Sequence, residues 1–386
     1  MDFAITDEQK MLVDTLRRFI ATELVPHEAM VDKQRSVPRD LAREIRAKAI
    51  QLGFYAINLP TSVGGGGLDH FTQALCEREF GHTSDALASV VARPTAILMN
   101  CRDEQVGEYL LPTVRGDKVE CFALTEPGAG SDARGITTSA RRDAADWIIN
   151  GTKQFISHAD VADFIILFAV TGEDETPRGR RKRFTAFLVD TDQPGVTIKP
   201  LDCISARGYN PNMIYLENVR VSARKILGAE GGGFDFANDW LYSGRVMLAA
   251  HCVGRARRVM AMAAEWCAQR KAFGQPIGQF QGTGFKLADM ATDIHVTDLM
   301  VHHAAWGMDQ GTITRREASM VNLYASEMIG RVTDNAVQVF GGMGLMEDMP
   351  IQRFWRDARV QRIWEGTSEV HRDIIARDLL REHQPS

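Results

Sequence analysis

The sequence predicts an α+β fold in which a helical segment, a β-rich segment and a second helical segment follow one another. Three observations predict this order. Apolar residues recur at helical spacing up to about residue 117, short β-rich runs then alternate with turn signals, and long helical segments joined by short loops follow. We therefore expect an N-terminal helical domain at 1–117, a middle β domain at 118–233 and a C-terminal helical bundle domain at 234–386.

The N-terminal segment carries start and stop signals for helices. Thr6 and Gln9 form a predicted capping box ahead of the first helix. A second helix is expected to begin near Pro38 and to stop at Gly53. Its apolar face should contain Leu41, Ile45, Ala49 and Leu52. The glycine-rich stretch at 63–69 is predicted to be a loop before another helix.

The middle segment contains six short β-rich runs, which is typical of a small sandwich or barrel. The dipeptide Asn150-Gly151 predicts a hairpin turn between two of these runs. The basic run at 179–183, GRRKR, is expected to be a solvated loop.

The last segment contains three long stretches without helix breakers, at about 234–269, 282–308 and 314–339. A short final helix is expected to begin near Thr367. Long helices joined by short loops predict an antiparallel bundle.

The bulk composition excludes several classes of protein. With a formal net charge of -5 and an isoelectric point of about 6.1, the chain lacks the basic footprint of a nucleic-acid-binding protein. Its six cysteines include no CxxC pair, so we expect reduced thiols, no disulfide framework and no metal site. The N-terminus resembles no signal or transit peptide, and the longest apolar run, at 164–170, is too short to cross a bilayer. We expect a soluble cytoplasmic protein without membrane insertion.

Two motifs of the middle segment offer groups that suit a flat or anionic ligand. CFALTEPGAGSD, at 121–132, is a glycine-rich turn that exposes backbone N–H groups beside the hydroxyls of Thr125 and Ser131. QFIS, at 154–157, places an aromatic ring next to a hydroxyl at the end of a strand. Taken alone, the first is also compatible with an ordinary hairpin loop and the second with a half-buried strand end.

Three motifs of the last segment are equally ambiguous alone. RKAFGQPIGQFQ, at 270–281, offers an arginine for phosphate and two phenylalanines for stacking, or is a surface loop. QVFGGMG, at 338–344, is also what a helix C-cap looks like. RIWEGTSEV, at 362–370, places Glu365 beside Trp364 and just ahead of a helix, where a carboxylate is either favoured by the helix dipole or tuned as a base.

Together these motifs resemble those of the acyl-CoA dehydrogenase family. TEPGAGSD, NGTKQFIS, RKAFGQPIGQFQ, FKLADM, QVFGGMG, RFWRDAR and WEGTSE stand in the family's order along the whole chain. The resemblance implies the family's three-domain fold with a C-terminal four-helix bundle, a homotetramer built as a dimer of dimers, and FAD as cofactor. It also implies oxidation of an acyl-CoA thioester to the trans-2-enoyl-CoA, in fatty acid or carboxylic acid catabolism, with electrons passed to electron-transfer flavoprotein.

The resemblance also implies roles for individual residues. The residues expected to line the flavin are Phe122, Leu124, Thr125, Gly130, Ser131, Phe155, Ile156 and Ser157. Those expected to bind the adenine and pyrophosphate of a neighbouring subunit's FAD are Arg270, Phe273, Phe280, Gln281, Gln338, Gly341 and Gly342. Thr367 and Glu369 are expected to meet the FAD phosphates or ribityl chain. The residues expected to contact the substrate are Ser131, Tyr242, Gly244, Arg245, Trp364, Gly366 and Arg377.

The implied mechanism assigns the base to Glu365, which takes the α-proton while flavin N5 accepts the β-hydride. Exclusion of water by substrate and by Trp364 is expected to raise the pKa of Glu365 toward working pH. The backbone N–H of Glu365 and a ribityl hydroxyl would hold the thioester oxygen, and Gly366 would permit its close approach. Some family members carry the base immediately before the CoA-contacting arginine. Here that position is Gly244, which leaves Glu365 as the only strong candidate and is expected to enlarge the acyl pocket.

Two departures from the family pattern, and one basic run, bear on the substrate. Trp364 stands where the family commonly has tyrosine, and Arg93 lies in a helix that usually helps line the acyl site. Arg93 would pair with a polar or carboxylated acyl group, or form a surface salt bridge. The run at 179–183 falls near the family's site for the adenine end of CoA. An oxidase or flavin monooxygenase on the same fold, and a non-catalytic FAD-binding assembly protein, remain alternatives, although Glu365 favours the dehydrogenase.

Overall fold

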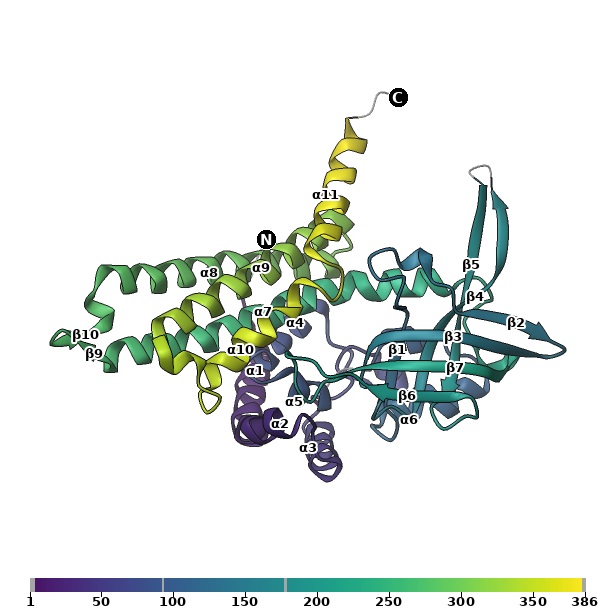
Figure 1. Cartoon of the computed structure of the whole chain (residues 1–386), viewed down its shortest axis with the longest axis horizontal. Coiled ribbons are helices and arrows are strands. Elements are labelled where there is room, and N and C mark those ends of the chain that lie inside the picture. The colour runs from purple at the N-terminus through teal and green to yellow at the C-terminus, as the bar shows by residue number, and fades with distance from the viewer. Residues whose placement is uncertain (1–3, 92–93, 177–178, 384–386) are drawn as a thin grey trace.

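The computed structural model of the chain describes residues 4–91, 94–176 and 179–383. Helices of the first third lie beside the middle of an elongated molecule, with a β-sheet at one end and long helices reaching to the other (Figure 1). The predicted order of helices, sheet and helices is therefore confirmed. No helix in the described ranges combines the length and apolar character that a membrane span requires.

The N-terminal part contains six α-helices. They are α1 (Asp7–Phe19), α2 (Glu28–Gln34), α3 (Arg39–Gln51), α4 (His70–Phe80), α5 (Asp85–Val90) and α6 (Leu111–Val114). The predicted capping box is confirmed, since the Gln9 N–H donates to Thr6 Oγ1 at 3.2 Å and the Thr6 N–H donates to Gln9 Oε1 at 3.0 Å. The apolar face of α3 is shorter than predicted, because Ile45 and Ala49 are buried whereas Leu52 is 49% exposed.

The middle part is one eight-stranded sheet. Its strands are β1 (Glu120–Ala123), β2 (Ser139–Asp143), β3 (Asp146–Ser157), β4 (Phe164–Thr176), β5 (Gly179–Asp190), β6 (Val196–Pro200), β7 (Pro211–Ser222) and β8 (Ile226–Leu227). Their order is β6-β7-β3-β2-β4-β5-β8, with β1 pairing parallel to β4.

The first half of β4 is buried on both faces of the sheet. Along β4, Phe164, Ile166 and Phe168 belong to a core shared with the N-terminal part and the following helix, whereas Ile165 and Leu167 belong to a core made mainly of sheet residues. This explains why the β4 segment is a continuous apolar run rather than an alternating one. The predicted sandwich or barrel is thus a single sheet curved around its own core.

The predicted hairpin turn at Asn150-Gly151 is wrong. Both residues lie inside β3, where the pairing with β7 shifts register between Ile149 and Gly151. A Cβ on Gly151 would lie 2.4 Å from Thr138 Oγ1, so glycine is required there by a close contact rather than by a turn. The turn between β2 and β3 is at Ala144 and the residue after it, six residues earlier in the chain.

The basic run at 179–183 is not the predicted solvated loop but the first part of β5. It pairs with an acidic stretch of β4, so that Arg183 forms an ion pair with Asp174, and Arg180 lies 3.9 Å from Glu173. Both ion pairs run diagonally between the strands, and the register also places Lys182 opposite Glu173 and Arg181 opposite Asp174, so opposite charges stabilise the pairing.

The last part is a set of packed helices. They are α7 (Gly233–Gln269), α8 (Gln281–Asp309), α9 (Arg315–Phe340), α10 (Pro350–Ala358) and α11 (Ser368–Glu382), with a small hairpin of β9 (Lys271–Ala272) and β10 (Gln275–Pro276) between α7 and α8. The three long helices begin and end within two residues of the predicted bounds, whereas α10 was not predicted. Helix α9 packs against α7, α8, α10 and α11.

Helix α7 joins the two cores of the molecule. Its first part packs Phe234 and Trp240 into the core beside the sheet, whereas its residues from Val246 onward belong to the core of the bundle. Figure 1 shows α7 running from the sheet into the bundle. The residues between these two stretches lie at the junction of sheet and bundle, where the candidate site is found.

Candidate active site

The turn at 363–367, here called the acidic turn, connects the end of the α10 region to α11. Glu365 and Gly366 both adopt left-handed backbone conformations, with φ of 56° and 102°. For a residue with a side chain this conformation costs on the order of 1 kcal/mol, so the surrounding structure must hold it. At its far end Thr367 caps α11, as predicted, by accepting a hydrogen bond from the Val370 N–H at 3.3 Å.

Helix α7 presents Gly244 to the acidic turn. A Cβ on Gly244 would lie 3.0 Å from Glu365 Oε2. The two positions that sequence reasoning weighed for a base therefore converge on one point in space. The space beside Gly244, expected to enlarge an acyl pocket, is occupied by the Glu365 carboxyl in this structure.

The indole of Trp364 is fixed by two neighbours. Its Nε1–H donates to Oε1 of the fully buried Gln361 at 2.9 Å, and its ring meets Tyr209 edge-on, with ring centroids 6.1 Å apart. Tyr209 in turn meets His158 edge-on at 4.4 Å. The aromatic side chain beside Glu365 is thus held rather than free to rotate.

Tyr209 connects the acidic turn to the end of β3. Burial, followed by the negative charges of Asp85 and Glu365, raises the pKa of Tyr209 to about 12, against the effect of a hydrogen bond with Ser157. Tyr209 therefore keeps its proton at neutral pH and lies between Glu365 and Ser157. Sequence analysis missed it because the loop before β7 carries no motif.

Two buried side chains back the acidic turn from α7 and α11. Arg245 is 5% exposed and donates to Ser319 Oγ at 3.4 Å; burial lowers the pKa of Arg245, Arg315 adds to this effect and Glu365 opposes it. A Cβ on Gly366 would lie 3.3 Å from Nε2 of the fully buried His371. Burial, and then the charge of Arg245, lower the pKa of His371 to about 4, so this imidazole is neutral.

Tyr242 lies on α7 one turn before these groups. Its hydroxyl donates to the backbone oxygen of Ile313 at 2.7 Å, which ties α7 to the segment before α9. The structure thus gathers the predicted substrate residues of α7 close to the acidic turn.

The glycine-rich turn after β1 lies beside the end of β3. The Gln154 N–H donates to Thr125 O at 2.9 Å, which places the two predicted cofactor motifs next to each other. Beneath them, Lys153 Nζ donates to Leu124 O at 2.9 Å and to Glu126 Oε1 at 2.8 Å. We call this ion pair the Glu126–Lys153 brace.

The brace is buried, and its two charges hold each other. Burial lowers the pKa of Lys153 to about 8, against the attraction of Glu126. Burial alone would raise the pKa of Glu126, but Lys153 and the hydrogen bonds from Thr137 and Thr138 hold it at about 2. Sequence analysis missed the brace, although both residues lie inside motifs that it singled out.

The predicted flavin-lining residues differ in what they expose. Phe155 is 60% exposed, and a Cβ on Gly128 or on Gly130 would meet no atom within 4 Å. An exposed aromatic ring beside an open glycine-rich turn fits a flat aromatic ligand. Thr125 and Ser157 are half-buried and Ser131 is exposed, so their hydroxyls remain accessible.

Three other side chains of this set face inward. Leu124 and Ile156 are buried in the two sheet cores, so only their backbone groups are open to a ligand. The Phe122 ring stacks on Trp240 at 4.6 Å, within the core between the sheet and α7.

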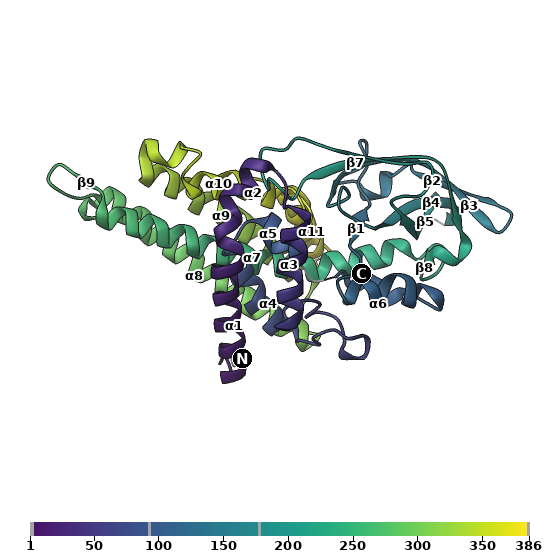
Figure 2. The same cartoon turned by 90° about the horizontal axis from the view of Figure 1, so that it is seen from below.

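A second set of predicted cofactor residues lies at the opposite end of the molecule. The tip formed by β9 and β10 and the end of α9 carries Arg270, Phe273, Phe280, Gln281, Gln338, Gly341 and Gly342 (Figures 1 and 2). The two parts of this tip are joined by the stacked rings of Trp266 and Phe340, 4.8 Å apart. Phe273 is 96% exposed, with φ of 50°. A single chain does not bring this tip to Phe155.

Two predicted substrate residues are not gathered at the site. Arg377 pairs with Asp373 at 2.9 Å on the exposed face of α11, and ten residues of helix place it about 15 Å along the axis from Thr367. Arg93 lies outside the described residues. Glu369 is exposed in the first turn of α11, near the helix N-terminus as predicted.

The described residues contain no group of three or more His, Cys, Asp or Glu side chains placed to hold a metal ion. The site therefore consists of a carboxylate on a strained turn, a fixed indole, a buried arginine and a neighbouring open aromatic surface.

Three family models match the chain. They describe the N-terminal, middle and C-terminal domains of acyl-CoA dehydrogenase and match residues 6–117, 121–219 and 231–380. Over 382 residues the chain is 37% identical to the 3-(aryl)acrylate reductase of Clostridium sporogenes, covering 97% of this chain and 99% of that protein.

Two solved structures are similar over nearly the whole chain. Butyryl-CoA dehydrogenase from Megasphaera elsdenii has a TM-score of 0.89 at 32% identity, covering 98% of this chain and 100% of that one. An acyl-CoA dehydrogenase from Bacillus anthracis, solved in complex with FAD, has a TM-score of 0.88 at 29% identity, covering 98% of this chain and 67% of that one.

Proposed function

The chain belongs to the acyl-CoA dehydrogenase family of flavoprotein oxidoreductases, and from this premise we propose that it removes the α- and β-hydrogens of an acyl-CoA thioester to give the trans-2-enoyl-CoA. The observation that carries the proposal is the convergence of Glu365 on Gly244. The Glu365 carboxylate lies beside Gly244, the position on α7 that has no side chain, and Gly244 is followed by the buried Arg245.

In this proposal Glu365 is the base that takes the α-proton. Trp364, held by Gln361 and Tyr209, limits the movement of the carboxylate and the access of water to it. The left-handed conformation at Gly366, together with His371 behind it, leaves no room for a side chain there, so the backbone is open to a thioester oxygen. The backbone N–H of Glu365 is the donor we assign to that oxygen.

FAD fits the open aromatic surface beside the glycine-rich turn. We assign the flavin ring to Thr125, Phe155 and Ser157, and the adenine and phosphates to Arg270 and Phe273 of a second copy of the chain. When bound, FAD supplies the acceptor for the β-hydrogen and its electron pair. The Glu126–Lys153 brace keeps the two ring-facing segments in register before the cofactor arrives.

A cluster of arginines suits the phosphates of CoA. Burial lowers the pKa of Arg134, and the charges of Arg181 and Arg315 add to this effect while those of Asp235 and Asp132 oppose it. Of the basic run at 179–183, Arg181 forms no ion pair within the described part of the chain, whereas Arg180 and Arg183 pair with carboxylates. We assign the nucleotide end of CoA to this cluster.

We also propose that the electrons pass from the flavin to electron-transfer flavoprotein. The assembly that we propose is a homotetramer. A second candidate function is reduction of an enoyl or aryl-acryloyl thioester, because the relative from Clostridium sporogenes is an aryl-acrylate reductase. The same residues serve both directions, since microscopic reversibility makes the protonated Glu365 the proton donor in reduction.

Anaerobic bleaching of the yellow flavin tests these functions. Purified protein is mixed with straight-chain, branched and aryl-substituted acyl-CoAs without oxygen. Bleaching by a saturated thioester supports the dehydrogenase and identifies the acyl class. Reoxidation of dithionite-reduced protein by an enoyl-CoA, without bleaching by any saturated thioester, supports the reductase. Rapid oxygen consumption after bleaching supports an oxidase, and the absence of both reactions supports a non-catalytic FAD-binding protein.

A further inference from the structure

A single carboxylate on α9 contacts the residues at both ends of the acidic turn. Glu327 Oε2 lies 3.2 Å from Nη1 of Arg362, the residue immediately before the turn. Glu327 Oε1 accepts a hydrogen bond at 2.8 Å from Oγ of Ser368, the residue immediately after it. Each oxygen of one carboxylate thus holds one end of a five-residue segment.

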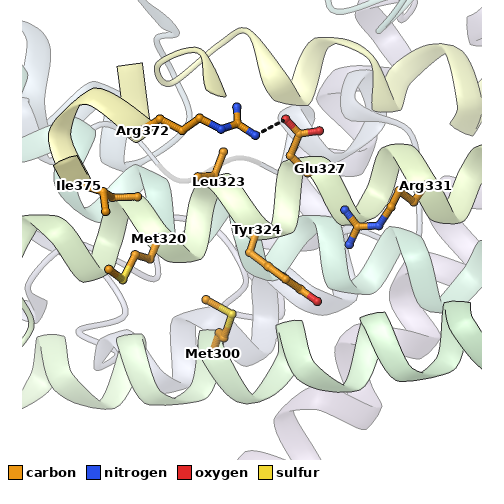
Figure 3. A pocket seen from close by; sticks show the side chains of 8 residues that line it. All are labelled: Met300, Met320, Leu323, Tyr324, Glu327, Arg331, Arg372 and Ile375. Carbon is orange, nitrogen blue, oxygen red and sulfur yellow. Dashed lines mark ion pairs between the residues drawn. The ribbon is translucent and has the colours of Figure 1, made fainter. Parts of the chain in front are cut away.

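A third contact extends this arrangement into α11. Arg372, one turn beyond Ser368, places Nη2 3.5 Å from Glu327 Oε1, and Figure 3 shows the two side chains meeting from facing helices. Burial would raise the pKa of Glu327, but the hydrogen bonds from Ser368 and Arg362 and the charge of Arg372 lower it. Glu327 is therefore ionised, and among the described residues it pairs with Arg362 before the turn and with Arg372 in the first part of α11.

A hollow on the surface lies next to the Glu327 side chain. A cavity of about 490 Å³ lies between α8, α9 and α11 directly beside Glu327 (Figure 3). Its lining residues are Met300, Met320, Leu323, Tyr324, Glu327, Arg331, Arg372 and Ile375. None of these residues belongs to the acidic turn, so the contacts of Glu327 with Arg362 and Ser368 are what connects α9 to both ends of the turn here.

We propose that Glu327 is a positioning residue for Glu365. It holds Arg362 and Ser368 at fixed separation and so keeps the left-handed conformation of Glu365 and Gly366, which aims the carboxyl at the point beside Gly244. This inference rests on the proposed role of Glu365 as the base. Its physical content, that Glu327 rigidifies the turn, is independent of that role.

We call the contacts of Glu327 with Arg362 and Ser368 the clamp. Two single variants, their combination as a double variant, and one control test it. Glu327→Gln keeps the shape but turns an amide N–H toward either Arg362 or Ser368, and Ser368→Ala removes one contact. The matched control is Asp293→Asn, because Asp293 on α8 forms an ion pair with Arg331 at 2.9 Å on the same side of α9 but contacts no residue of the turn in the described part of the chain.

The first measurement is flavin reduction per bound flavin at saturating acyl-CoA. Since a misplacement of about 1 Å costs about 100-fold in rate, Glu327→Gln is expected to lose about 10- to 100-fold with KM within about threefold. Ser368→Ala should lose about 3- to 10-fold, and the double variant should be no slower than Glu327→Gln, because both act through one contact. Asp293→Asn should stay within about twofold of wild type.

The second measurement is hydrogen–deuterium exchange of the amides at 363–370, which needs no activity. Exchange there should accelerate about tenfold in Glu327→Gln and in Ser368→Ala and remain unchanged in Asp293→Asn. If wild type is inactive with every acyl-CoA, the proposed function fails while exchange still decides the clamp.

The clamp is overturned if Glu327→Gln keeps more than half of the wild-type rate, or if Asp293→Asn loses as much. Should Glu327→Gln fail to fold or to bind flavin, Ser368→Ala decides, and unchanged exchange in that variant overturns the inference.

Discussion

The proposed cofactor residues are held by internal contacts at the sheet end of the molecule and are largely exposed at the opposite tip. At the sheet end, a buried ion pair and a backbone hydrogen bond hold Thr125 and Phe155 in place within one chain. At the far tip, Phe273 stands 96% exposed on a small hairpin (Figure 1). Within its own chain the Phe273 ring meets the Phe280 ring edge-on, with centroids 6.1 Å apart, and the rest of its surface is open. We infer that one chain prepares the reacting half of the site and that a second copy completes it.

The largest expected effect comes from the acidic turn. Glu365→Gln should keep FAD and lose about 1,000-fold or more in the rate of flavin reduction, because the amide cannot take the α-proton. Stopped-flow spectroscopy under anaerobic conditions measures this rate. A variant that keeps more than a tenth of the wild-type rate would remove Glu365 from the role of base.

The next largest effect is expected at the Glu126–Lys153 brace, which supports the glycine-rich turn and the end of β3. Lys153→Met leaves the carboxylate of Glu126 buried without its partner, which should destabilise the fold by about 3–5 kcal/mol. Chemical unfolding of the FAD-free protein measures this loss. Lys182→Met serves as control, since the hydrogen bonds that Lys182 makes to described residues go to backbone oxygens near the same turn, at 2.8 Å to Ile136 O. Equal losses in the two variants would contradict a special role for the brace.

The third prediction addresses the exposed half. Arg270→Ala should weaken FAD binding about 10- to 100-fold without lowering the thermal stability of the chain, because Arg270 is exposed and forms no ion pair with any described residue. The sharper measurement is complementation. Glu365→Gln and Arg270→Ala chains, inactive alone at limiting FAD, should regain up to about a quarter of wild-type activity when assembled together, since random mixing makes that share of sites intact. If the mixed chains regain no activity, Glu365 and Arg270 do not complete one site from two different chains, and the proposed shared site is wrong.

The smallest effect is expected at the indole. Trp364→Phe keeps an aromatic ring against Tyr209 but loses the hydrogen bond to Gln361, which is worth about 1 kcal/mol. The rate should fall by less than about tenfold, and the ranking of acyl-CoAs by kcat/KM should change. An unchanged ranking would show that Trp364 does not shape the acyl pocket.

The fold was predictable where the signals are local. The capping box at Thr6, the bounds of α8 and α9 and the cap of α11 depend on neighbours within a few residues, and the structure confirms them. The prediction from Asn150-Gly151 was wrong because glycine is required there by a close contact with Thr138, which lies on another segment. A pattern of neighbouring residues cannot reveal such a contact.

The candidate site was likewise predictable where its residues stand close together in the sequence. Its motifs are contiguous, so the acidic turn and the two ring-facing segments could be found by inspection. Tyr209 meets Trp364 and Glu327 meets Arg362 across long stretches of chain. Such contacts follow from the packing of helices and sheet, and neither residue stands in a motif.

Gly244 has a consequence for how chains of this fold can change. Because a Cβ there would lie 3.0 Å from Glu365 Oε2, even an alanine at 244 requires the carboxyl end of Glu365 to shift by a few tenths of an ångström. The side chain at 244 and the position of the Glu365 carboxyl are therefore coupled, so a substitution on helix α7 can re-aim the proposed base without any change at residue 365.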